Sequence, residues 1–167
     1  DTLFNIDSIY VGAGATVNLG GAGGQIRYDT VKTITGPGIL NLNYMRVVVT
    51  GNLDLTTFSN VPTMSNSGFA FAAPSAVNFT PRPETSLNYL EQRGPGTLTI
   101  QGNGFKVYDF ALTGGTLDLG AGLSDTVEAT FSVSGSPTLD FNSATLCVTA
   151  DSVNFSSLAS LVAGTGA

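Results

Sequence analysis

The sequence contains no histidine and no tryptophan, and it has a single cysteine and only two lysines, Lys32 and Lys106. Without histidine, serine–histidine and cysteine–histidine nucleophile pairs and histidine metal sites are excluded. One cysteine cannot form an internal disulfide or a thiolate zinc site. The strand-like run around Cys147 predicts a small apolar side chain packed in a sheet. We therefore expect a protein that is not an enzyme and needs no cofactor.

Charge is also scarce, since Asp, Glu, Lys and Arg make up 11% of the chain, and the net charge is −6. An average globular protein has about 25% charged residues. No basic patch is present, so binding to nucleic acid through phosphate contacts has no electrostatic basis. Apolar runs such as 68–73 are far shorter than the ~20 residues of a membrane helix, so no membrane span is expected. A surface rich in Ser, Thr, Asn and Gly indicates an extracellular, cell-surface or virion-surface location.

The length of 167 residues predicts a single domain, 1–167, but residues 56–93 differ from the rest. This stretch carries four prolines and no charged residue before Arg82. Because proline is kept out of central strands, we predict that 56–93 is a proline-rich apolar extension or arm within the domain. Large apolar groups on such an arm would pack on the chain itself or on a neighbouring subunit. The candidates for a subunit contact are Phe58, Met64, Phe69, Phe71 and Phe79.

What the chain does contain is a short degenerate repeat: an apolar residue, then Asn, Asp or Thr, then an apolar residue. Such alternation places the outer two side chains on one face of a strand. The first unit begins at Val17 and the last at Val153, so the eight steps average 17 residues, and single steps range from 10 to 24. The nine units begin at Val17, Leu40, Leu53, Val77, Leu87, Leu98, Leu117, Leu139 and Val153.

Glycine and proline corners precede several of these units, as in Gly36-Pro37-Gly38 and Gly94-Pro95-Gly96. Such corners followed by brief strands resemble the degenerate rungs of parallel β-helix proteins, such as autotransporter passenger domains and phage fibre or tailspike segments. The resemblance implies an all-β parallel β-helix, or solenoid, of roughly 20 residues a rung. The alternative is an antiparallel β-sandwich or jelly roll, which strands every 8–12 residues would suit equally well.

Three of the units carry an aspartate in the middle position: Asp54, Asp118 and Asp140. If the strands stack in register, these carboxylates would line one outer face. Carboxylates arranged in that way could serve as acid and base in polysaccharide cleavage, or bind calcium. The six other units have Asn or Thr at this position, so the position requires polarity and not charge. We therefore interpret the aspartates as the polar half of a strand and predict no metal site.

These features together predict a non-enzymatic structural subunit of a multi-copy assembly, namely an extracellular filament, a virion fibre or a capsid-decorating protein. Its partners would be copies of itself or other structural subunits, because open strand edges need to be covered. The alternative is a glycan-binding adhesin module that recognises surface glycans. The absence of tryptophan and the dispersal of the five tyrosines along the chain argue against a sugar site. A polysaccharide-degrading enzyme is a third hypothesis, which depends only on the aspartates.

Overall fold

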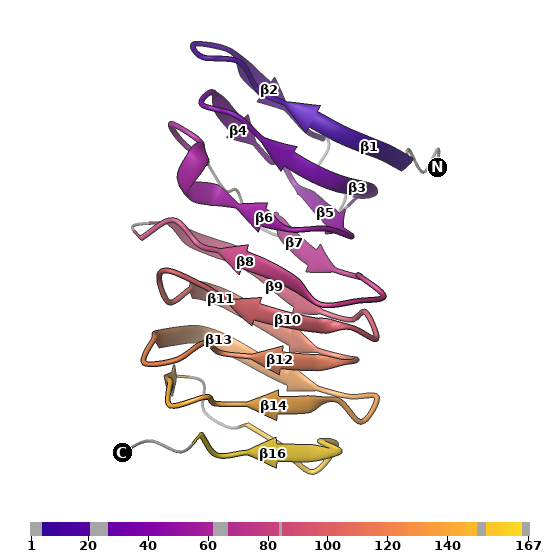
Figure 1. The fold of residues 1–167 in the computed structure, drawn as a ribbon, viewed down its shortest axis with the longest axis vertical. Helices are drawn as coiled ribbons and strands as arrows, with labels where there is room; N and C mark the ends of the chain where they lie inside the picture. The colour runs from indigo at the N-terminus through magenta and orange to yellow at the C-terminus, as the bar shows by residue number, and fades with distance from the viewer. Residues whose placement is uncertain (1–4, 21–26, 62–66, 84, 150–152, 165–167) are drawn as a thin grey trace.

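The computed structural model describes residues 5–20, 27–61, 67–83, 85–149 and 153–164. The chain forms a parallel β-solenoid of about 7 turns, with the strands stacked one above the next from the N-terminus to the C-terminus (Figure 1). This confirms the predicted all-β class and decides for the solenoid, because every strand pairing among the described residues is parallel. Among the described residues, no helix is long and apolar enough to cross a membrane.

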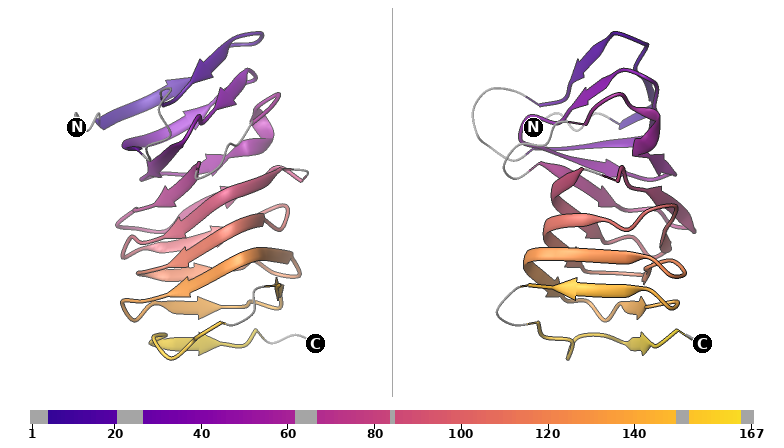
Figure 2. Two further views of the ribbon diagram at one scale, coloured as in Figure 1. Left: turned by 180° about the vertical axis from the view of Figure 1, so that it is seen from behind. Right: turned by 90° about the vertical axis from the view of Figure 1, so that its left-hand side faces the viewer.

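Two sheets form the walls of the stack, and from Met45 onward each turn of the chain adds one strand to each wall (Figure 2). The long sheet has eight strands, in the order β1 (Asn5–Tyr10), β3 (Arg27–Thr35), β5 (Met45–Val49), β7 (Gly68–Phe71), β9 (Ser86–Gln92), β11 (Lys106–Leu112), β13 (Ser124–Val133) and β15 (Thr145–Val148). The short sheet has six strands, in the order β6 (Leu53–Asp54), β8 (Val77–Thr80), β10 (Thr97–Ile100), β12 (Thr116–Asp118), β14 (Thr138–Asp140) and β16 (Ser160–Val162). β2 (Thr16–Asn18) pairs with β4 (Ile39–Asn41), and the 3-10 turn η1 (Leu55–Thr57) follows β6.

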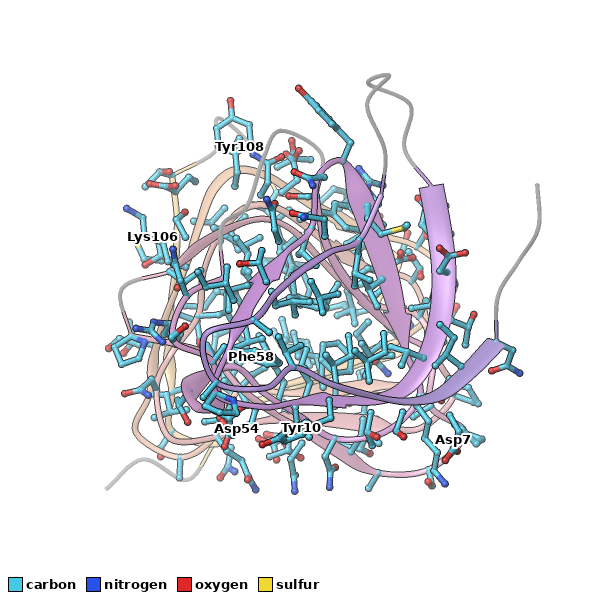
Figure 3. The ribbon with its side chains drawn as sticks, turned by 90° about the horizontal axis from the view of Figure 1, so that it is seen from above. Asp7, Tyr10, Asp54, Phe58, Lys106 and Tyr108 are labelled. Carbon is cyan, nitrogen blue, oxygen red and sulfur yellow. The ribbon has the colours of Figure 1, made fainter. Side chains whose placement is uncertain are left out.

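The core is built from columns of apolar side chains that repeat at the same place in successive rungs. In the short sheet, Leu98 lies opposite Val77 and Leu117, and Leu117 lies opposite Leu139. The three leucines are fully buried. In the long sheet, one inward column contains Val47, Phe69, Leu90, Phe110 and Phe131. Seen from above, side chains fill the space enclosed by the strands, and Phe58 lies within it (Figure 3).

Glycine and proline are found where the chain turns from one sheet to the other. Gly36 has φ +130°, and a Cβ atom there would lie 2.2 Å from the carbonyl oxygen of Val11 in the preceding rung, so only glycine fits. The corner after β9 is held by Gln92, whose buried side-chain amide donates to the carbonyl oxygens of Gly94 and Gly96, both at 3.0 Å. The sequence repeat therefore marks corners as well as strands.

The described parts of 56–93 are placed differently from the expected extension or arm. They contribute β7, β8 and β9, which lie in the middle of the two sheets. The prolines do not interrupt these strands, because every described proline lies between strands. Pro74, for example, lies between β7 and β8, and Pro81 directly follows β8. The proline content of this stretch thus reflects its corners, and its phenylalanines belong to the shared core.

Candidate functional site

The structure brings together two of the three aspartates that the repeat singled out. Asp118 in β12 lies directly opposite Asp140 in β14. Asp54 does not join them, because it lies opposite Thr80. The column of Asp118 continues instead to Thr99 and Asn78. Parallel stacking therefore gives a pair of carboxylates on the outer face of the short sheet, and not a row of three.

Each of these aspartates accepts a backbone hydrogen bond from the residue two positions later. Asp54 Oδ1 accepts from Thr56 N at 2.9 Å, Asp118 Oδ1 from Gly120 N at 2.9 Å, and Asp140 Oδ1 from Asn142 N at 3.0 Å. Asn154 Oδ1 accepts from Ser156 N at 2.8 Å in the same way. This is the side-chain turn that Asp and Asn form at chain reversals. The shared task explains why the position takes Asp or Asn.

The carboxylate pair has few further partners of the kind that a catalytic or metal site requires. Asn142 Nδ2 donates to Asp118 Oδ1 at 3.2 Å, and Thr99 Oγ1 donates to Asp118 Oδ2 at 3.5 Å. In the described part of the chain, no cluster of three or more His, Cys, Asp or Glu side chains could hold a metal ion. The observed geometry is that of a corner that stabilises the fold.

A substitution at Asp118 separates its turn-forming role from a role that depends on charge. Asp118→Ala leaves Gly120 N, at a buried position, without its acceptor, so we expect a loss of about 1 kcal/mol in the free energy of unfolding. Asp118→Asn retains the acceptor oxygen and should stay within about 0.5 kcal/mol of the wild type. Urea unfolding at constant pH measures both values. An Asn variant as unstable as the Ala variant would mean that the charge itself is needed.

A second cluster, which combines arginine and tyrosine side chains, lies on the outer face of the long sheet. Tyr28, Arg46, Gly68 and Tyr89 lie side by side on β3, β5, β7 and β9. Gly68 has no side chain, so the guanidinium of Arg46 reaches across it and lies 3.5 Å from the centre of the Tyr89 ring. Arg46 Nη1 also donates to the Tyr28 hydroxyl at 3.0 Å. Residues far apart in the sequence are thus joined across four successive strands of the long sheet.

Glu91 connects this cluster to the following corner. The carboxylate of Glu91 accepts from the Tyr89 hydroxyl at 3.0 Å and from the Thr113 hydroxyl at 3.1 Å, and it lies 4.0 Å from Arg93 Nη1. Burial, together with the Glu91 carboxylate, raises the pKa of Tyr89 above its ordinary value. The guanidinium of Arg93 lies 5.7 Å from the centre of the Tyr28 ring. The arginine guanidiniums therefore lie over the rings of Tyr28 and Tyr89, and these cation–π contacts stabilise the sheet.

The described residues that were expected to contact another subunit lie in the core of this chain. Phe58, Phe69, Phe71 and Phe79 are at most 1% exposed in the chain's own core. Their apolar character is explained by packing inside this chain, and they are not available on its surface. Met64 lies outside the described residues. Cys147 is exposed on β15, and not packed in the sheet as expected, because its place in the strand alternation faces outward.

Among the described residues, the large aliphatic side chains that are exposed lie at the two ends of the stack, which the sequence predicted only as open strand edges. Leu161 in β16 continues the inward column of Leu98, Leu117 and Leu139, yet it is 55% exposed. At the other end, Ile6 in β1 lies opposite the buried Val31 and is 38% exposed. The repeat unit beginning at Val153 could not reveal this end, because β16 begins after it, at Ser160.

Comparisons with known proteins give no indication of what these surfaces bind. No family model, curated protein or solved structure matches the chain.

Proposed function

We propose that this solenoid is a structural subunit that assembles into a multi-copy extracellular or virion structure by stacking head to tail. The observation that supports the proposal is the inward column of the short sheet, which ends in Leu161. Its equivalents Leu98, Leu117 and Leu139 are 0% exposed, whereas Leu161 is 55% exposed. Fully burying a leucine side chain stabilises by about 1.5–3 kcal/mol. A rung placed on β16 would bury it.

The first rung of a second copy is suited to that position. β1 is an edge strand with Ile6 in an inward column, and Tyr10 at its end is 70% exposed. At both ends of the described stack, the edge strand has no further described strand beside it and carries exposed apolar side chains, and natural proteins usually cover such edges. Contact between two different ends is heterologous, and such contacts form rings when the rotation closes and open filaments when it does not. Stacking along the axis of the solenoid places each copy above the last, so we expect filaments. The few charged residues, 11% of the chain, and the absence of a basic patch are consistent with a role as building material outside the cell.

Sedimentation velocity and electron microscopy of the purified chain test this proposal. We expect the wild type to form end-to-end multimers whose mass rises with protein concentration. Leu161→Asp places a charge in the end contact and should shift the population to monomers. Tyr108→Asp is the matched control, because Tyr108 is 51% exposed on the flank of the long sheet (Figure 3), and it should assemble like the wild type. Circular dichroism verifies that both variants remain folded.

Two outcomes would count against the proposal. A wild-type chain that stays monomeric at all concentrations would reject assembly by this domain. Multimers that persist unchanged in Leu161→Asp would show that the copies meet through another surface.

A further inference from the structure

Asp125, the second residue of β13, is buried among apolar side chains. It is 1% exposed and faces inward, in phase with the buried Val127 two residues later. Phe105 N donates to its Oδ1 atom at 2.9 Å. The other oxygen, Oδ2, is also buried and has no hydrogen-bond partner in the part of the chain that the structure describes. An ionised carboxylate at this position would lose its hydration, and the single hydrogen bond from Phe105 N replaces only part of it.

The charged groups on the neighbouring strands are directed away from Asp125. On β11 and β13, Lys106 Nζ pairs with Glu128 Oε1 at 3.0 Å, and the Lys106 side chain is 55% exposed. Asp109 of β11 shares the outer-face column of Tyr89. β15, which pairs with β13 on its C-terminal side, has no charged residue. Across the interior, Asp118 and Asp140 bond turn amides at the corners after β12 and β14. No described cation therefore faces Asp125.

Burial raises the pKa of the Asp125 carboxyl to about 7, an effect that the hydrogen bond from Phe105 only partly opposes. The ordinary pKa of an aspartate side chain is 3.8. Between these two values, the folded chain holds a proton that the unfolded chain has released. The free energy of unfolding therefore falls as the pH rises through this interval. The contribution of Asp125 is complete below about pH 4 and is lost above about pH 7.

We propose that Asp125 is a pH-sensitive element of the fold. The packing of β11, β13 and β15 is more stable in acid, and it becomes less stable when the Asp125 side chain ionises. The device is independent of the proposed assembly, because it depends on contacts within one chain. The pH-dependent contact lies on β13, the second-to-last strand of the long sheet. The rings of Phe105, Phe110 and Phe131 stack on the same strands and the corner before them, with ring centroids 5.5 and 5.3 Å apart.

Urea unfolding of the wild type and of Asp125→Asn, between pH 4 and pH 8, tests the proposal. Asparagine keeps an oxygen that accepts from Phe105 N but does not titrate. We expect the ratio of the wild-type unfolding constant to that of Asp125→Asn to rise on the order of a thousandfold over this range. Asp7→Asn, whose side chain is 86% exposed, controls for the change in net charge. A ratio that stays constant with pH would overturn the proposal.

A measurement on the wild type keeps the test decisive should Asp125→Asn fail to fold. Carbon-13 NMR of the Asp125 carboxyl in the native chain reports its ionisation directly. A titration midpoint near pH 7 supports the proposal, whereas a midpoint near pH 4 contradicts it.

Discussion

Gly68→Ala should destabilise the solenoid by about 3 kcal/mol or more, which lowers the melting temperature by about 6–12 °C. A Cβ atom on Gly68 would lie 1.8 Å from the carbonyl oxygen of Tyr89 and 2.7 Å from its carbonyl carbon. The obstacle is the backbone of the next rung, which cannot rotate away as a side chain can. The added methyl group would also enter the space through which Arg46 reaches the Tyr89 ring. Thermal and urea unfolding measure the loss.

Gly12→Ala is the matched control for this substitution. A Cβ atom on Gly12 meets nothing within 4 Å, and its φ lies outside the left-handed region, so we expect a change within about 0.5 kcal/mol. Gly104→Ala repeats the test at a corner, where the Cβ atom would lie 1.8 Å from the carbonyl oxygen of Ser124. If both Gly68→Ala and Gly104→Ala were as stable as Gly12→Ala, the rungs could not be stacked in the described register.

Phe79→Ala should lower the free energy of unfolding by about 3–5 kcal/mol, and the loss should not depend on protein concentration. Phe79 is fully buried, and its ring centroid lies 5.3 Å from that of Phe71 and 6.5 Å from that of Phe69. Removing the ring leaves a cavity beside Phe69 and Phe71, in the interior between the two sheets. Urea unfolding over a dilution series measures both the loss and its independence from association.

Tyr108→Ala provides the comparison, because it removes an aromatic ring that is 51% exposed and should cost no more than about 0.5 kcal/mol. The two interpretations of Phe79 give opposite results. If Phe79 contacted another subunit, Phe79→Ala would reduce multimer mass and leave the stability of the dilute monomer unchanged. Packing within the chain predicts that the dilute monomer itself is destabilised.

The repeat predicted the parallel solenoid because apolar–polar–apolar triplets and glycine corners reflect the physics of a rung. Val77, Leu98, Leu117 and Leu139 are the inward residues of the short sheet, as the alternation indicated. The same triplet is less informative about which wall a strand joins. The unit at Leu87 belongs to the long sheet, in β9, because any strand with one buried face has this alternation.

The sites were harder to predict, because they depend on register across rungs. The step between units varies with corner length, so the sequence alone could not tell that Asp54 falls outside the column of Asp118. The contact of Arg46 with Tyr89 spans Gly68 and has no local signal. Asp125 did leave a signal, since it shares the phase of Val127 in an alternating strand. That phase predicts an inward carboxylate once the strand is recognised.

The register of the short sheet also makes its rungs interchangeable. Leu98 and Leu117 occupy the same place in successive turns. A chain that lost residues 98–116 would therefore join Thr97 to Leu117 and still have an unbroken inner column, with one turn fewer. Gain or loss of a whole turn changes the length of the solenoid, while the residues at its two ends stay the same. Length in such a protein can thus drift by duplication and deletion without a new fold having to be found.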